Sequence, residues 1–340
     1  MSLPAVDNPI SAIAPQLLDA CPLCAGRTFE ALPTPERWVG PETFGGLRGR
    51  FGLSRCRGCR LVFVNPRPSR QQLRAFYDAG SVAAGPSVMG AYTDFLSGLL
   101  PRRLTASGAA YLLDRIERAL PPGAPRTLLE CGTGKGTFLL RARARGWQVW
   151  GLEPGRRGRQ ICRSVGLNVT DRLDELPAGA FGLIVLNRVL GQLTDPIGAL
   201  QGIQRLVAPE GRLFVNVPNT ASLRARLALP ALSRYVSRVD ERYRAFPIEL
   251  TYYDSHTLAP LLAKGGWTVE QTFTVGLGLD EFIVQSDLPA LPHRTEGAVT
   301  KRRGGPQRRP QRRLRHLLRD AFLDLELGEN LAVIARPSRA

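Results

Sequence analysis

Two short cysteine motifs lie near the start of the 340-residue chain, one pairing Cys21 with Cys24 and the other Cys56 with Cys59. A C-x-x-C turn lets both sulfurs face one ion, and two such turns complete a tetrahedral site with Zn–S distances near ~2.3 Å. Gly58 suits the tight turn inside the second pair. Because four thiolates leave no open coordination position, the motifs predict a structural Zn²⁺. A redox pair and chance are the alternatives, and a doubled motif is much less expected by chance than a single one.

A glycine-rich turn follows the apolar run 127–129 and has the sequence Glu130-Cys131-Gly132-Thr133-Gly134-Lys135-Gly136. Glycines at this point let the backbone turn sharply and approach a ligand closely, as at the first strand-to-helix turn of a doubly wound sheet. The spacing is not that of a P-loop, and Thr137 stands where a dinucleotide fingerprint has its last glycine. What remains is the pattern acid-x-G-x-G-x-G. A purely structural glycine turn is the alternative.

A second acid, Glu153, ends the next apolar run. An acid at that point can accept hydrogen bonds from ribose hydroxyls and disfavours a 2′-phosphate. The turn and this acid together predict a nucleoside cofactor. The predicted binding residues are Glu130, Gly132, Gly134, Gly136 and Glu153.

The elements that position these residues alternate between strand and helix. Strands are predicted at 127–130, 148–153, 168–170, 182–186, 212–217, 268–275 and 331–335, and helices at 111–120, 137–145, 158–165, 196–207 and 255–264. Such alternation predicts an α/β fold, namely a doubly wound, mostly parallel seven-stranded sheet with helices on both faces. The remaining cysteines, Cys131 and Cys162, are expected to be packed small residues.

The net charge of +17 is concentrated in one place, because Lys301–Arg319 holds nine Lys and Arg residues and no acid. Such a run can contact RNA, lipid or an acidic partner, but it is more often a solvated linker or helix face. The first eighteen residues lack Lys, Arg and a long apolar run, so no secretory signal is expected. No run approaches the ~18 apolar residues that span a bilayer. We therefore expect a cytoplasmic protein.

The run 128–154 resembles motif I and the acidic second strand of class I S-adenosylmethionine-dependent methyltransferases, and 181–196 and 208–219 resemble their later strands. The segment 56–68 is similar to the zinc-ribbon-like N-terminus of a bacterial subgroup found in sugar, lipid and secondary-metabolite pathways. The resemblance implies a Rossmann-like methyltransferase that binds S-adenosylmethionine. It also implies this division of the chain: a zinc module (1–80), a helical linker or cap (81–120), the methyltransferase domain (121–285, with an insertion at 220–250), a basic linker and helix (286–319), and a C-terminal helix end with the last strand (320–340).

Two departures from the subgroup affect the acceptor side. Where the subgroup usually has His-x-Leu-Glu-His, the chain has Arg188-Val189-Leu190-Gly191-Gln192, and the His that commonly precedes a later Tyr or Phe is missing. Both positions often lie near the cofactor or the acceptor in the subgroup. An inactive cofactor-binding relative is therefore one alternative function.

The resemblance implies methyl transfer to a small-molecule acceptor, a sugar, lipid or secondary-metabolite intermediate. Asp171 is expected to bracket the adenine, or to cap a helix. Asn187 is expected to face the methyl group, or to satisfy a loop. The candidates for an acceptor-side base or orienting group are Glu249, Tyr252, Tyr253 and His256. An RNA methyltransferase that uses the basic segment is the remaining alternative, although the acceptor motifs expected of one are missing.

Overall fold

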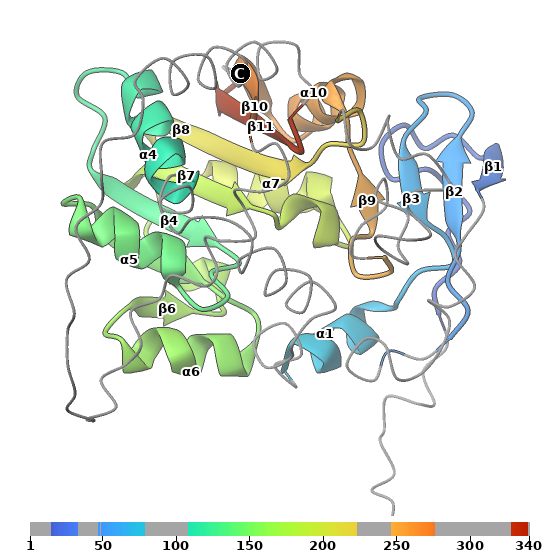
Figure 1. The fold of residues 1–340 in the computed structure, drawn as a ribbon, viewed down its shortest axis with the longest axis horizontal. Helices are drawn as coiled ribbons and strands as arrows, with labels where there is room; N and C mark the ends of the chain where they lie inside the picture. Colours follow the sequence, from blue (N-terminus) through green and yellow to red (C-terminus); the bar gives the residue numbers. More distant parts are fainter. Residues whose placement is uncertain are drawn as a thin grey trace, which may run out of the picture.

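The computed structural model describes residues 15–32, 47, 49–78, 108–222, 246–275 and 328–338. Its main element is a seven-stranded sheet with the order β10-β11-β8-β7-β4-β5-β6 (Figure 1). The strands are β4 (Thr127–Cys131), β5 (Gln148–Leu152), β6 (Asn168–Thr170), β7 (Phe181–Asn187), β8 (Val207–Pro218), β10 (Trp267–Val275) and β11 (Asn330–Pro337). Only β11 runs against the others. The predicted seven-stranded, mostly parallel sheet is confirmed.

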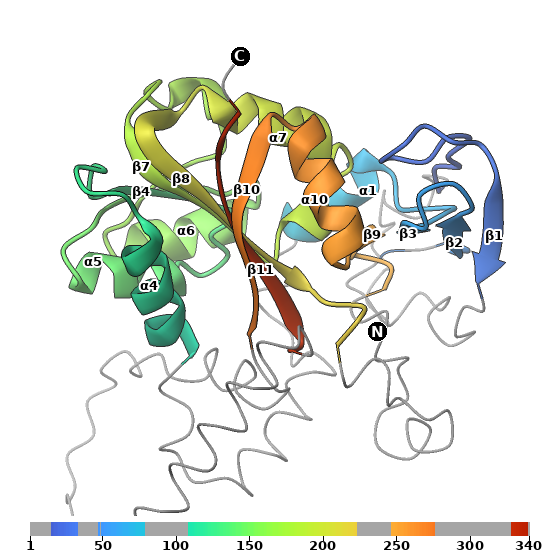
Figure 2. The same cartoon turned by 90° about the horizontal axis from the view of Figure 1, so that it is seen from above.

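Helices cover both faces of this sheet (Figure 2). On one face lie α4 (Gly108–Ala119), α5 (Thr137–Ala144) and α6 (Arg156–Ser164), and on the other α7 (Pro196–Gln204) and α10 (Ser255–Lys264). Each face has its own cluster of buried apolar side chains, one around Leu113 and Leu139 and the other around Leu200 and Leu261. Because parallel strands buried on both sides need two layers of helices, the doubly wound arrangement follows.

The fifth of these strands, β8, is longer than predicted. The sequence predicted a strand at 212–217, but β8 begins at Val207 and contains an irregularity, since Phe181 of β7 pairs with Val207 and Leu183 pairs with Arg212. A Cβ at Gly211 would lie 2.6 Å from the carbonyl oxygen of Phe181, so the two backbones approach closely there. Gly211 therefore marks a β-bulge. A glycine at a bulge resembles a glycine at a turn in the sequence, so the start of the strand was not predicted.

A second, four-stranded sheet lies beside the first (Figure 1). It consists of β1 (Phe29–Leu32), β2 (Leu53–Cys56), β3 (Val62–Val64) and β9 (Thr251–Tyr252), all antiparallel to their neighbours. Tyr253, directly after β9, forms a parallel bridge to Asn219 after β8. Helix α1 (Arg70–Asp78) follows the first three strands. The second sheet thus joins the N-terminal segment to residues 251–252.

Several predicted features fall outside the described residues: the basic segment 301–319 with its helix, residues 81–107 of the helical cap, and 223–245 of the insertion. Within the described ranges, no helix is both long enough and apolar enough to cross a membrane.

Candidate functional site

The glycine turn leaves the carboxyl end of β4 in a left-handed conformation at all three glycines. The φ angles of Gly132, Gly134 and Gly136 are 74°, 54° and 74°. A Cβ at Gly132 would lie 2.5 Å from Val189, and one at Gly136 would lie 2.5 Å from Leu167. At Gly134, in contrast, no atom lies within 4 Å of that position. Two of the glycines are therefore required by packing, and the third borders open space at the carboxyl edge of the sheet, where ligands bind in such folds.

The Glu153 carboxylate joins this turn to the end of β5. One oxygen accepts a hydrogen bond from the Gly134 N–H and the other accepts one from the Gly155 N–H, both at 2.8 Å. Burial raises the pKa of Glu153, and these two hydrogen bonds oppose that effect. Since a carboxylate oxygen has two lone pairs, each can accept a second hydrogen bond from a ligand hydroxyl. The geometry suits the role in ribose binding predicted for Glu153.

Glu130 is a deeply buried acid at this edge, with 3% of its surface exposed. Its Oε2 atom has no hydrogen-bond partner among the described residues. Burial raises the pKa of Glu130 well above its ordinary value, and the nearby charge of Glu153 raises it further. A buried polar atom without a partner usually has one in a ligand or solvent molecule. A cationic ligand group beside Glu130 would stabilise its ionised form, so the residues present fit a sulfonium cofactor.

The raised pKa of Glu130 gives a first prediction about stability. Between the ordinary pKa of a glutamate and the higher folded-state value, the folded protein binds more protons than the unfolded chain. Stability without ligand should therefore fall as the pH rises through that window. Glu130→Gln should remove this loss, and we expect it to raise the melting temperature at pH 8 by at least about 2 °C.

The measurement is the melting temperature of the ligand-free protein from pH 5 to pH 8, and Glu210→Gln, at an exposed acid, is the control. A Glu130→Gln protein that melts lower than the wild type at pH 8 would contradict the prediction.

Asp171 and Asn187 lie at the carboxyl ends of β6 and β7. Asp171 is exposed and forms an ion pair with Arg159, at 3.0 Å. Asn187 is half-buried, and its Oδ1 accepts a hydrogen bond of 2.9 Å from the Asn216 side chain on β8. Asp171 caps no described helix. Both residues border the same edge as the glycine turn, and their contacts with a ligand remain predictions.

Helix α1 contributes a tyrosine to this edge, which was not predicted from the sequence. The Tyr77 hydroxyl donates a hydrogen bond of 2.8 Å to Oε1 of Gln192 in the short 3₁₀ turn η5 (Leu190–Gln192). Burial raises the pKa of Tyr77, and the charges of Glu249 and Glu153 raise it further. Tyr77 thus contacts the 188–192 loop and lies near the charges of Glu153 and Glu249. The only sequence signal for this contact was the unusual Gln192.

The structure explains why residue 191 is glycine. A Cβ there would lie less than 2 Å from Oε1 of Glu249 and 2.7 Å from the Thr251 carbonyl oxygen. The Leu250 N–H donates a hydrogen bond of 2.7 Å to the Gly191 carbonyl, which fixes the two segments together. Glu249 is 1% exposed. The Glu249 carboxylate therefore occupies the space that a side chain at position 191 would need.

The other acceptor-side candidates are placed differently. Tyr253 is fully buried, and its hydroxyl has no hydrogen-bond partner in the described part of the chain. Burial raises its pKa, and the charge of Glu249 raises it further. Tyr252 is also buried, but its side chain lines a separate cavity between the two sheets. His256 is exposed in the first turn of α10, behind the N-cap Asp254. Glu249 and Tyr253 are thus the two candidates that lie together.

The four predicted metal ligands converge, and all four sulfurs lie within 4.8 Å of one another. The Sγ atoms of Cys21 and Cys59 are 3.6 Å apart, and those of Cys24 and Cys56 are 3.5 Å apart. An ideal tetrahedral zinc site places its sulfurs about 3.8 Å apart, so the set fits one ion. Burial raises the pKa of the Cys21 thiol to about 11. At Cys24 desolvation also raises the pKa. Hydrogen bonds from the Gly26 N–H and the other sulfurs together outweigh that effect and lower the pKa to about 7.

The two cysteine turns have the same backbone geometry. The residue after each second cysteine, Ala25 or Arg60, has a left-handed φ, 60° or 65°. Its N–H donates a hydrogen bond of 2.9 Å to the carbonyl of the first cysteine of the pair. Gly58 lies in the second turn, as predicted, but the turn does not require glycine there, because its φ is not left-handed and a Cβ would have ordinary contacts. The remaining cysteines, Cys131 and Cys162, are buried as predicted.

Comparisons with known proteins identify a matching family and several similar solved structures. A model of the methyltransferase domain family matches residues 104–272, about half of the chain. No curated protein matches the chain. Solved structures that are similar to it include a SAM-dependent methyltransferase from Thermotoga maritima, with 18% identity, a TM-score of 0.41, and coverage of 69% of this chain and 90% of that one. Another, from Archaeoglobus fulgidus, has 15% identity, a TM-score of 0.40 and coverage of 67% and 93%.

The family match covers the glycine turn, Glu130, Glu153 and the five strands β4 to β8 of the main sheet. The four-cysteine cluster lies outside it. Together with the strand order and the conformation of the turn, the match establishes the family. The chain belongs to the class I S-adenosylmethionine-dependent methyltransferases.

Proposed function

We propose that the protein transfers a methyl group from S-adenosylmethionine to a small-molecule acceptor, a sugar, lipid or secondary-metabolite intermediate. The observation that carries the proposal is the convergence of Glu130, Gly134 and Glu153 at one edge of the sheet, with Glu249 and Tyr253 buried on its acceptor side. Groups buried this deeply suit an acceptor that is small enough to enter an enclosed site.

S-adenosylmethionine supplies an electrophilic methyl group that is displaced in line. Most of the catalysis can therefore come from holding the acceptor at near-attack distance. In this proposal Glu153 binds the ribose hydroxyls, Glu130 stabilises the cationic part, Asp171 brackets the adenine and Asn187 faces the methyl group. Glu249 accepts the proton that the acceptor atom loses, or orients that atom through a hydrogen bond.

We also propose that Cys21, Cys24, Cys56 and Cys59 hold one structural Zn²⁺. The sulfur positions and the closed set of four thiolates support this. The ion would stabilise the four-stranded sheet, since β2 ends at Cys56 and the second cysteine turn connects β2 to β3.

The proposed function can be tested with S-adenosylmethionine that carries a radiolabelled methyl group and a fractionated cell extract as the source of acceptors. Label should appear in the fraction of small molecules and should be insensitive to ribonuclease. Glu249→Gln should lower kcat by about 100-fold or more while the affinity for S-adenosylhomocysteine stays within twofold. Glu210→Gln serves as the exposed control.

Label in ribonuclease-sensitive material would instead favour an RNA acceptor. Cofactor binding without transfer to any fraction would favour an inactive relative.

A further inference from the structure

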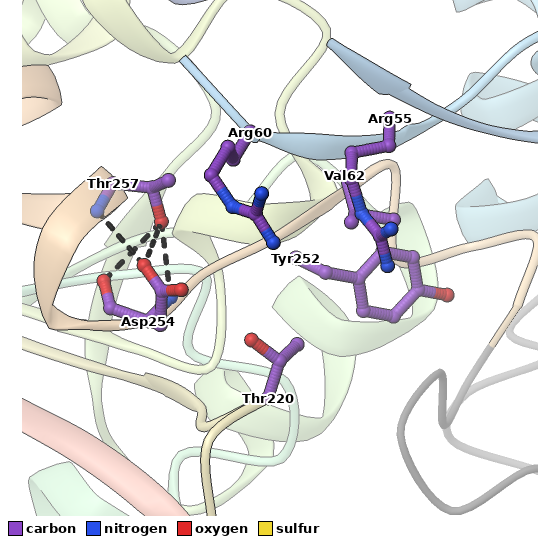
Figure 3. Close-up of a pocket in the computed structure, with 7 residues that line it drawn as sticks. All are labelled: Arg55, Arg60, Val62, Thr220, Tyr252, Asp254 and Thr257. Carbon is purple, nitrogen blue, oxygen red and sulfur yellow. Dashed lines mark hydrogen bonds between the residues drawn. The ribbon is translucent and has the colours of Figure 1, made fainter. Parts of the chain in front are cut away.

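The four-stranded sheet and its two cysteine turns are called the cysteine module here. A cavity of about 170 Å³ lies between this module and the methyltransferase domain. Figure 3 shows that it is lined on one side by residues of the second cysteine turn and its strands, and on the other by residues that follow β8 and begin α10. The polar side chains of its lining include Arg55, Arg60, Thr220 and Asp254. At roughly 30 Å³ per water molecule, the cavity has room for a group of about five heavy atoms.

Two guanidinium groups dominate the charge of this cavity. The side chains of Arg55 and Arg60 extend into it (Figure 3). Arg55 forms one ion pair, 3.5 Å from a Glu30 side chain that is 51% exposed, and an exposed pair of this kind is weak. Arg60 is exposed and has no ion-pair partner among the described residues. The two arginines can therefore form bidentate hydrogen bonds with a planar or tetrahedral anion.

The opposite wall does not cancel this charge. Asp254 is the only acid among the described lining residues. Its Oδ1 atom accepts hydrogen bonds from the Thr257 backbone N–H, at 2.9 Å, and the Thr257 hydroxyl, at 2.7 Å, as the N-cap of α10. With one carboxylate engaged in the cap and two guanidinium groups present, the lining keeps a net positive charge.

The cavity is also within reach of the methyl-transfer edge. Thr220 lies four residues beyond Asn216, whose side chain bonds Asn187 at the end of β7. Four extended residues span at most about 13 Å. The wall of the cavity at Thr220 is therefore joined through a short stretch of chain to the strand that contacts Asn187.

We propose that this cavity binds an anionic group of the methyl acceptor, a phosphate or a carboxylate. The proposal rests on the proposed function for the acceptor, but anion binding itself can be measured without it. The cysteine module would then contribute to substrate selection as well as to the fold.

The test follows the arginine Nε–H signals of the full zinc-loaded chain by NMR during titration with inorganic phosphate and, separately, with succinate. At least one anion should give saturable shifts of the Arg60 signal. Arg60→Gly should weaken that binding by about tenfold or more. Because Arg60 has a left-handed φ, glycine relieves strain there, so this variant should fold at least as well as the wild type.

Arg57→Gln is the matched control, since Arg57 lies in the same turn, is exposed, and does not line the cavity. Its affinity should stay within twofold of the wild type. Saturation by phosphate alone would indicate a phosphorylated acceptor, and saturation by succinate alone a carboxylate.

Absence of saturable binding for both anions, or equal loss in the Arg57 and Arg60 variants, would overturn the anion site. A parallel titration with S-adenosylhomocysteine separates the two proposals, because its failure would overturn the proposed function and leave the anion result intact.

Discussion

Replacement of Gly134 with valine is expected to abolish binding of S-adenosylmethionine and to leave the metal site intact. Gly134 has a φ of 54°, and no protein atom lies within 4 Å of the position a Cβ would take. A valine side chain would therefore project into the space beside Glu153 that the cofactor needs. We expect the affinity for S-adenosylhomocysteine, measured by calorimetry, to fall by more than about 100-fold, or roughly 3 kcal/mol.

The control for this prediction is Gly179→Val. Gly179 also has a left-handed φ, 64°, and no atom within 4 Å of its Cβ position, but it lies in the exposed loop before β7. It therefore carries a similar conformational strain without facing the site. Its affinity for S-adenosylhomocysteine should stay within twofold of the wild type. If both variants lose binding equally, strain and not occlusion is responsible.

Replacement of Cys56 and Cys59 with serine is expected to remove about one zinc ion per chain and to unfold the N-terminal module. Structural zinc sites contribute about 10–16 kcal/mol of apparent binding free energy at neutral pH, which is more than a small sheet of short strands supplies. Metal analysis after dialysis should find a stoichiometry near one in the wild type and near zero in the variant.

The loss should spread from the cysteines to β9, because β3 pairs with residues 251 and 252. Amide hydrogen exchange should therefore become faster at Thr251 and Tyr252, while the glycine turn on β4 stays protected. The control is Cys162→Ala, which alters a buried cysteine on α6 and should keep the metal. A double serine variant that retains one zinc per chain would contradict the prediction.

Local patterns were enough to predict the elements and the cofactor turn. All seven strands of the main sheet were expected from apolar runs, and helix α10 was predicted with its observed bounds. Its start is specified within four residues, because Asp254 and Thr257 form a capping box. The left-handed glycines and the two C-x-x-C turns also follow from short-range spacing. Signals of this kind depend only on neighbours in the chain.

The acceptor side could not be predicted in the same way. From the sequence, Gly191 suggested a missing acid, and Glu249 was one of four candidates for the acceptor side. The fold brings the Glu249 carboxylate to within 2 Å of where a Cβ of residue 191 would be. Tyr77 likewise reaches Gln192 across 115 positions of the chain. Neither contact leaves a periodic signal, because each depends on one pair of side chains.

The sequence alone thus determined the sheet, its helices, the glycine turn and the two C-x-x-C turns, because each is encoded by periodicity or by residues a few positions apart. The tertiary structure decided which acids share a site, which tyrosine lies near them, and that β9 completes the sheet of the cysteine module. The physical reason is that these arrangements arise where the carboxyl ends of separate strands and an N-terminal helix are packed together. That packing depends on the burial of the two apolar faces of the main sheet. Many residues distant in the sequence contribute to it, so no local pattern predicts it.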